Sequence, residues 1–376
     1  MSGRARRVAV LFGGPSPEHD VSILTGLQAV RALREVREVA EIHALYWTKT
    51  GSWCEVPTGV EAAAFLSGAP DGATPLELLV GPGGGFVARR GRLTTRFEPL
   101  GLDAAIVCCH GGPGEDGALQ GVLDLLGLPY SGPSAAGAAL GMDKLATTGI
   151  LQAGGIPVLP RTLLVAGQAE PAFAGPYIVK PRYGGSSIGI EVVADYSTAL
   201  ARLGANVHLR RGAVIEPYRP DLFDLQVAVR TWPKPALSAI ERPLRRDAGA
   251  EILDYRDKYV GGEGMLSAPR ELPAQLDAGL ERELREAALL AAGLLGARGV
   301  NRIDFLSDGD RLYLNEINTI PGSLSRHLFV EPPVAFAELL AGMLDEALAR
   351  PAAQLSSAGA DGTVLRSAGA IAAKLS

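Results

Sequence analysis

The segment from Gly299 to His327 constrains the fold of this chain most, because it predicts a β-hairpin. Residues 300–306 are rich in apolar and β-branched side chains, and residues 311–318 form a second segment suited to a strand. The four residues between them, Ser-Asp-Gly-Asp, have the composition of a tight turn. We therefore expect the two strands to pair.

The polar residues of this hairpin predict a site for a metal ion and a phosphate. Side chains alternate along a strand, so Arg302 and Asp304 share one face, as do Glu316 and Asn318. Carboxylate and amide oxygens suit a hard cation such as Mg²⁺, and a guanidinium suits a phosphate or an oxyanion. An exposed hairpin with a solvated polar face is the alternative, and Glu-x-Asn alone would favour it.

The complete spacing is more specific and carries a family resemblance. Arg-x-Asp is followed after eleven residues by Glu-x-Asn, and a Pro-Gly pair then turns the chain. This pattern resembles the Mg²⁺-binding end of ATP-grasp enzymes, in particular the D-alanine–D-alanine ligase family. The resemblance implies that the metal ligands are Asp304, Glu316 and Asn318. It also implies an oxyanion site formed by Arg302 and the Gly322 N–H.

The composition is that of a soluble globular α/β protein. The chain has 376 residues, 47% of them hydrophobic, and 47 glycines, which suits two or three domains with many tight turns. A net charge of −5 predicts no nucleic-acid binding, and no apolar run approaches the roughly 20 residues of a membrane span. Three cysteines, two of them adjacent, argue against a disulfide framework and favour the reducing cytoplasm.

The N-terminal segment predicts the opening of a doubly wound unit. Residues 8–12 form a short apolar strand, a Gly-rich loop follows, and residues 21–33 have the apolar spacing of a helix. The loop lacks G-x-G-x-x-G, which disfavours a nicotinamide site. Glu18 either complements the helix dipole or, as the family motif GG-x-S-x-E implies, contacts the ammonium group of the first substrate.

A second strand tip carries His110. Residues 104–109 predict a core strand, and His110 begins the sequence HGGPGEDG. A histidine at such a point is often only a loop residue. The family carries HG-x-x-G-E-D-G here, which implies that His110 helps to orient the carboxylate of the first amino acid.

Two lysines and a Gly-Ser loop predict a phosphate site. Lys144 opens a helix, and Lys180 ends a strand that leads into residues 182–189. Glycines let backbone N–H groups approach phosphates, and Ser186 and Ser187 add hydroxyl donors. Surface lysines and a flexible hairpin tip are the alternatives. The family motifs M-D-K and G-S-S-V-G imply that the two lysines and Ser187 bind ATP, and that Ser186 belongs to the catalytic set.

The resemblance also implies an adenine site at the hinge after residues 213–218, with Glu216 as its acid. Here the chain departs from the family. The glutamate expected to bind the ribose hydroxyls is absent, and the segment is one residue longer. Asp224 is the nearest substitute.

Residues 254–259 match the family motif D-Y-x-x-K-Y. A surface strand of mixed charge is the alternative. The motif implies that Lys258 reaches the γ-phosphate and that Tyr259 closes a loop against Glu18 and Ser186. A tyrosine at this point is associated with an amine as the second nucleophile.

The pocket for the second substrate is another departure. In the family a serine and a leucine follow Pro-Gly, and the serine holds the carboxylate of the second substrate. Alignment without a gap places His327 at the serine and Leu328 at the leucine. Either Ser325 or Arg326 replaces the hydroxyl, or the imidazole, which can carry charge near neutral pH, marks a different amine acceptor.

These motifs span about residues 6–350 in the order of the family. They imply an α/β, three-domain ATP-grasp fold: an N-terminal doubly wound parallel domain over 1–132, a central ATP-grasp subdomain over 133–220, a C-terminal metal domain over 221–350 and a tail over 351–376. The implied reaction joins two amino acids through an acyl phosphate, with D-alanyl-D-alanine for peptidoglycan as the favoured product. The implied cofactors are ATP and two Mg²⁺ or Mn²⁺ ions, and the implied state is a cytoplasmic homodimer.

Other classes fit less well. A non-catalytic ATP-binding protein would need an incomplete metal set, and all three predicted ligands are present. ATP-grasp carboxylases and kinases would lack Glu18, His110 and Tyr259 in this arrangement. A ligase of the family, acting on D-alanine or on a different amine acceptor, is therefore the hypothesis.

Overall fold

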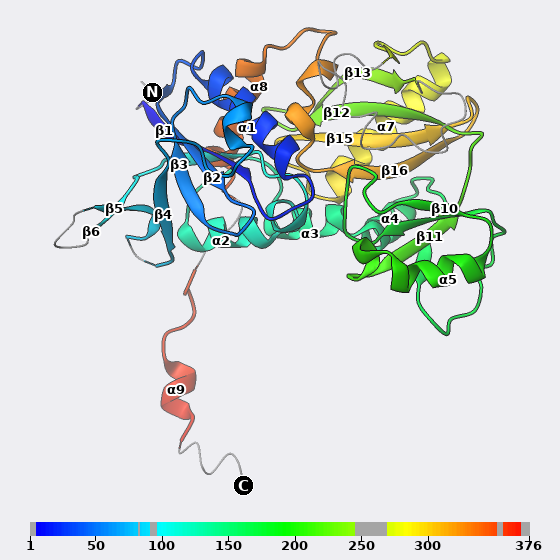
Figure 1. The fold of residues 1–376 in the computed structure, drawn as a ribbon, viewed down its shortest axis with the longest axis horizontal. Coiled ribbons are helices and arrows are strands. Elements are labelled where there is room, and N and C mark those ends of the chain that lie inside the picture. Colours follow the sequence, from blue (N-terminus) through cyan, green and yellow to red (C-terminus); the bar gives the residue numbers. More distant parts are fainter. Residues whose placement is uncertain (1–4, 82, 91–95, 245–268, 352–355, 370–376) are drawn as a thin grey trace.

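The computed structural model describes residues 5–81, 83–90, 96–244, 269–351 and 356–369, and three β-sheets organise them (Figure 1). The N-terminal sheet lies at one end of the molecule in this view, and the other two lie at the opposite end. Among the described residues, no helix is both long and apolar enough to cross a membrane.

The N-terminal sheet has seven strands in the order β6-β5-β4-β3-β2-β1-β7. They are β1 (Arg6–Gly13), β2 (Val39–Trp47), β3 (Trp53–Val56), β4 (Thr74–Leu79), β5 (Gly85–Arg90), β6 (Arg96–Pro99) and β7 (Ala104–Val107). β1 is parallel to β2 and β7, and an antiparallel meander from β2 to β6 extends this unit. The expected parallel unit is thus confirmed for three strands.

Helices from both ends of the chain pack on the parallel strands. α1 (His19–Leu33) contacts β1, and α8 (Phe336–Ala349) contacts β7 and α1. α2 (Ala118–Leu126) and the 3₁₀ turns η1 (Ala62–Phe65) and η2 (Gly112–Gly114) complete this part. The apolar core of the sheet includes side chains from residues 320–344. Late segments of the chain therefore belong to the N-terminal core.

The central sheet is antiparallel, in the order β10-β9-β11-β8, and has a core of its own. Its strands are β8 (Thr162–Leu164), β9 (Tyr177–Pro181), β10 (Glu191–Val193) and β11 (Ala213–Pro217). The helices of this region are α3 (Ala135–Met142), α4 (Lys144–Ala153) and α5 (Tyr196–Ala205), with the turn η3 (Val207–Leu209).

The third sheet is also antiparallel, in the order β14-β13-β12-β15-β16. Its strands are β12 (Phe223–Arg230), β13 (Ala236–Pro243), β14 (Arg270–Glu271), β15 (Val300–Ser307) and β16 (Leu312–Asn318). α7 (Ala278–Leu294) packs on it through the buried stripe Leu280, Leu284, Ala288 and Ala291, whose spacing of three or four residues is that of one helix face. The 3₁₀ turn η5 (Gly322–Leu328) follows β16, and α9 (Thr363–Ser367) in the tail buries no residue. Each sheet falls within one predicted domain, while the boundaries at 132, 220 and 350 stay a prediction.

Candidate active site

The predicted hairpin consists of β15 and β16, and its register places the polar side chains opposite one another. Arg302 pairs with Asn318, and Asp304 pairs with Glu316. Ile303, between them in the sequence, points to the other face and is fully buried. The alternation expected from the sequence therefore holds for all four polar residues.

A β-bulge adds Asn315 to the polar face. The register shifts after Asp304, which pairs with Glu316, whereas Phe305 pairs with Leu314. Asn315 and Glu316 are consecutive, yet both line the cavities described below. A strict period of two gives no signal for Asn315.

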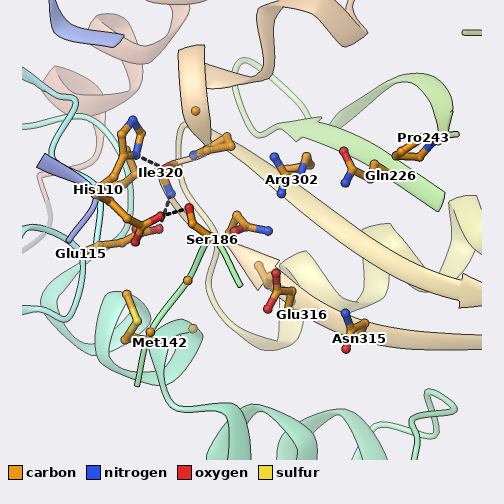
Figure 2. A pocket seen from close by; sticks show the side chains of 18 of the residues that line it. His110, Glu115, Met142, Ser186, Gln226, Pro243, Arg302, Asn315, Glu316 and Ile320 are labelled. Carbon is orange, nitrogen blue, oxygen red and sulfur yellow. Dashed lines mark hydrogen bonds between the residues drawn. The ribbon is translucent and has the colours of Figure 1, made fainter. Parts of the chain in front are cut away.

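The register across the sheet extends this face into a row of four side chains. Gln226 of β12 pairs with Asp304 on one side and with Glu241 of β13 on the other. The row therefore runs from Glu241 to Glu316 across four strands, and each of its residues lines a cavity. We call this row, Glu241, Gln226, Asp304 and Glu316, the polar floor of the site, and Figure 2 shows Gln226 and Glu316 on it.

The predicted metal ligands form a donor set that suits a divalent cation of the Mg²⁺ type. Arg302 donates two hydrogen bonds to Asp304, at 2.7 and 2.8 Å, and Asn318 Nδ2 donates a third at 3.1 Å. Glu316 faces Asp304 across the hairpin, and 26% of its side chain is exposed. Within the described residues, no group of three or more His, Cys, Asp or Glu is placed to hold a metal. Two carboxylates and an amide fit a cation that takes its remaining ligands from phosphates.

Lys144 enters the site from the first turn of α4. Asp143 caps this helix, because its carboxylate accepts hydrogen bonds from two backbone N–H groups of the first turn. The Lys144 ammonium donates to the Gly184 carbonyl of the Gly-Ser loop and lies 3.9 Å from Glu316 Oε2. Burial lowers the pKa of Lys144, and the charge of Glu316 opposes that change. The lysine thus connects the loop to the polar floor.

Lys180 lies in a second buried cluster, with Glu216 and Arg161. Lys180 Nζ is 2.9 Å from Glu216 Oε2, and Arg161 Nε is 2.7 Å from Glu216 Oε1. Burial by itself would raise the pKa of Glu216, but the two cations outweigh it and lower the pKa to about 2. Arg161 also donates to the carbonyl oxygens of Lys144 and Asn315. Arg161 was not among the predicted site residues, because no motif surrounds it.

The Gly-Ser loop meets the N-terminal sheet at Glu18, whose carboxylate accepts a hydrogen bond from the Ser186 hydroxyl. Ser186 and Ser187 have φ values of 52° and 59°, in the left-handed region that is costly for residues other than glycine. A Cβ atom at Gly185 would lie 3.0 Å from Glu18 Oε2. The glycine therefore permits the close approach of loop and carboxylate.

His110 and Glu115 tie the loop after β7 to the segment before Pro-Gly. His110 Nδ1 lies 2.7 Å from the Ile320 carbonyl oxygen (Figure 2). Glu115 accepts hydrogen bonds from the N–H groups of Gly111 and Ile320, each at 3.0 Å. Burial lowers the pKa of His110 to about 4 and raises that of Glu115 to about 7. Glu115 was not among the predicted site residues, although it lies in the quoted motif HGGPGEDG.

The predicted pocket for the second substrate contains an unexpected acid. His327 Nε2 lies 3.2 Å from Glu241 Oε2, and Arg270 lies 3.0 Å from Glu241 Oε1. Gly322 and His327 line the same cavity as Glu241. Leu328, by contrast, is fully buried in the N-terminal core and lines neither cavity, so it supports the pocket from behind.

Two adjoining cavities collect most of the predicted site residues. The first is lined by residues that include Glu18, His110, Ser186, Arg302, Gly322 and His327. The second is lined by residues that include Lys180, Ser187, Glu216, Asp224 and Asp304. Lys144, Asn315 and Glu316 line both, so the cavities meet at the hairpin. Lys258 and Tyr259 lie outside the described residues.

Comparisons with known proteins agree with this arrangement. The family description "D-ala D-ala ligase N-terminus" matches residues 7–133, and "D-ala D-ala ligase C-terminus" matches residues 161–344. The D-alanine–D-alanine ligase of Corynebacterium aurimucosum is 33% identical, over 92% of this chain and 98% of the relative. That of Pelodictyon phaeoclathratiforme is 32% identical, over 91% and 97%.

Solved structures show the same fold. The D-alanine–D-alanine ligase of Coxiella burnetii has a TM-score of 0.74 at 24% identity, over 93% of this chain and 95% of the other. A D-Ala:D-Ser ligase from Enterococcus faecalis has a TM-score of 0.73 at 24% identity, over 92% and 100%. The two family matches and the relatives above 30% identity place the chain by sequence: it belongs to the D-alanine–D-alanine ligase family of ATP-grasp enzymes.

Proposed function

We propose that this chain joins two D-alanine molecules in an ATP-dependent reaction and supplies D-alanyl-D-alanine for peptidoglycan. The observation that carries the proposal is the meeting of the two cavities at Glu316. On one side lie the lysines and the Gly-Ser loop, which suit a nucleoside triphosphate, and on the other lie Glu18 and Arg302, which suit a zwitterionic amino acid. The family membership supports the same reaction.

The proposed chemistry has two steps, and atoms balance in each. The carboxylate of the first D-alanine attacks the γ-phosphorus of ATP, which gives an acyl phosphate and releases ADP. The amine of the second D-alanine then attacks the acyl carbon, loses a proton, and expels inorganic phosphate. Arg302 and Gly322 both line the first cavity. We propose that the guanidinium and the Gly322 N–H stabilise the oxyanion of the tetrahedral intermediate.

The remaining predicted residues are proposed to bind ATP and the metal ions. Lys144 and Lys180 are proposed to hold the ATP phosphates, with Ser187 and the loop backbone. Asp304, Glu316 and Asn318 are proposed to hold one or two Mg²⁺ or Mn²⁺ ions, which would neutralise phosphate charge. Asp224 is the proposed ribose contact, because it lies two residues before Gln226 on β12 and lines the second cavity. A cytoplasmic homodimer is proposed as the working state.

A different amine acceptor is the second candidate. It is favoured by the pair of His327 and Glu241 in the predicted acceptor pocket, where the family has a serine at the position of His327. An imidazole held by a carboxylate is larger and more basic than a hydroxyl.

A substrate panel tests both candidates. Release of ADP and of dipeptide would be measured with the purified chain and D- and L-amino acids, alone and in pairs. D-Alanine alone should give the highest rate under the first candidate. A higher rate for D-alanine paired with another amine would favour the second, and no ADP release with any pair would refute both.

A further inference from the structure

A chain of three hydrogen bonds, two of them buried and one partly buried, connects α1 to the turn after Pro321. The Ser323 N–H donates to Thr25 Oγ1 at 3.0 Å, and Thr25 Oγ1 lies 2.8 Å from His110 Nε2. His110 Nδ1 lies 2.7 Å from the Ile320 carbonyl oxygen. Thr25 is 0% exposed and His110 is 3% exposed, so bulk water does not compete for the two bonds of the His110 ring. The chain closes a loop from Ile320 through the histidine and the threonine back to Ser323.

The chemistry of the groups sets the direction of each bond. A carbonyl oxygen only accepts, so His110 Nδ1 carries a proton and donates it to Ile320. A neutral imidazole has a single N–H, and His110 Nε2 must therefore accept. The Thr25 hydroxyl then donates to Nε2, while its oxygen accepts from the Ser323 N–H.

The surroundings keep His110 neutral. Burial lowers its pKa to about 4, and the charge of Arg302 acts in the same direction. Both ring nitrogens are engaged by protein groups. In this arrangement His110 is neutral, so any part it takes in orienting the substrate carboxylate does not depend on a positive charge.

The turn that receives these bonds adopts a costly backbone conformation. Ser323, Leu324 and Ser325 have φ values of 48°, 48° and 49°, and each lies in the left-handed region that side chains disfavour. Such residues persist only where neighbouring groups hold them. Gly322, which precedes them, lines the first cavity together with Arg302.

We propose that Thr25 is a positioning residue for the acceptor step. Its hydroxyl holds His110 as the neutral Nδ1–H tautomer and, through the Ser323 N–H, holds the turn that presents Gly322 to the reacting carbonyl. The kinetic part of this inference rests on the proposed function, whereas the tautomer does not.

The tautomer can be read from the unmodified chain, with one variant needed only to assign the signal. Long-range ¹H–¹⁵N spectra of the full chain, labelled at its five histidines, report the protonation of each ring nitrogen, and His110→Gln assigns the signal. We expect His110 to show a protonated Nδ1 and an unprotonated Nε2 throughout the range from pH 6 to pH 8. A protonated Nε2, or titration within that range, would overturn the proposal.

The positioning role is tested by variants that separate the two chemical steps. Thr25→Val removes the hydroxyl at nearly constant volume, and Thr25→Ser retains it. Hydroxylamine traps the acyl phosphate as a hydroxamate, so it measures the first step alone. For Thr25→Val we expect kcat for the dipeptide to fall by about ten- to a hundredfold, with hydroxamate formation and the KM for ATP unchanged. Thr25→Ser should restore kcat.

Ser22→Ala is the matched control. Ser22 is buried one turn earlier on α1, where it accepts from the Gly13 N–H and donates to the Cys108 carbonyl, each at 2.7 Å. Its loss should lower stability to a similar extent without a selective fall in kcat.

Wild-type kcat in folded Thr25→Val refutes the positioning role. Absence of hydroxamate from the unmodified chain refutes the proposed function instead. If Thr25→Val does not fold, the positioning role is judged from the His110 spectra and from kcat of Thr25→Ser.

Discussion

At the scale of single residues, Glu316 has the strongest expected effect. It faces Asp304 across the hairpin, lies 3.9 Å from Lys144, and lines both cavities. Glu316→Gln keeps the shape but removes the charge that a divalent cation and Lys144 both need, so ADP formation should nearly cease while the fold is retained.

The measurement is ADP release at several Mg²⁺ concentrations, together with the melting temperature. Glu338→Gln, an acid on α8 that pairs with Arg230 at the surface, is a control that should keep wild-type turnover. Near-normal turnover of folded Glu316→Gln would remove Glu316 from the metal site.

His327 determines the choice of acceptor in our second candidate function. If the imidazole narrows the pocket, His327→Ser should raise the use of D-alanine as acceptor relative to the best native acceptor. Competition between the two acceptors in one reaction, read by mass spectrometry, gives this ratio directly. Efficient D-alanyl-D-alanine formation by the unmodified chain, with the ratio unchanged in the variant, would show that the pocket idea is wrong.

Glu115 makes stability depend on pH. Burial raises its pKa in the folded chain to about 7 from an ordinary value of 4.5. Because the folded pKa is the higher one, the contribution is present below pH 4.5 and is lost as the pH rises to about 7. The loss should be on the order of 3 kcal/mol, since one pKa unit corresponds to roughly 1.4 kcal/mol.

Urea unfolding of the chain and of Glu115→Gln between pH 4.5 and pH 7.5 checks this. The stability of the unmodified chain relative to the variant should decrease with rising pH, because glutamine does not titrate. Parallel curves for the two proteins would mean that the carboxyl group has an ordinary pKa. Other carboxylates, such as Glu216 with a lowered pKa, affect both proteins equally.

At the scale of elements, sequence periodicity predicted the hairpin but not all of its polar face. The alternation of Arg302 and Asp304 follows from the period of two, whereas the bulge that adds Asn315 interrupts that period. Arg161, Thr25 and the pair of Glu241 and Arg270 were missed for another reason. Their contacts join segments far apart in the chain, and no local pattern records such pairings.

The Gly-Ser loop, residues 182–189, is the element that we expect to respond to nucleotide. Its described contacts to the rest of the site include the bond from Ser186 to Glu18 and that from Lys144 to the Gly184 carbonyl. Bound phosphates would add hydrogen bonds to its backbone N–H groups, so an ATP analogue should slow hydrogen exchange in this loop.

Mass-spectrometric exchange with and without the analogue gives the comparison, and α5, which lines neither cavity, serves as the internal reference. Equal protection of residues 182–189 in the two states would count against phosphate binding by the loop. We expect the same response of residues 254–264, most of which bear the D-Y-x-x-K-Y motif and all of which lie outside the described residues.

At the scale of the whole molecule, segments that come late in the sequence pack into the core of the N-terminal sheet. The core of the N-terminal sheet includes Ile320, Leu324 and Leu328, followed by the apolar face of α8. The segment that carries Gly322 is therefore packed against one sheet while β16, just before it, belongs to another. This connection places the turn between Arg302 on the third sheet and His110 on the first.

Because α8 completes the N-terminal core, a cavity in that helix should weaken the parallel strands at the other end of the sequence. Leu340 is fully buried on α8, the helix that contacts β7 and α1, and Leu340→Ala should cost about 2–5 kcal/mol. We expect faster hydrogen exchange in β1 and β7 than in β12 and β15. Leu284→Ala on α7 is the matched cavity, equally buried in the core of the third sheet, and should reverse the pattern. If both variants sped exchange in the same strands to the same extent, the two cores would unfold as one unit. The packing would then not divide the molecule into two separately stable cores.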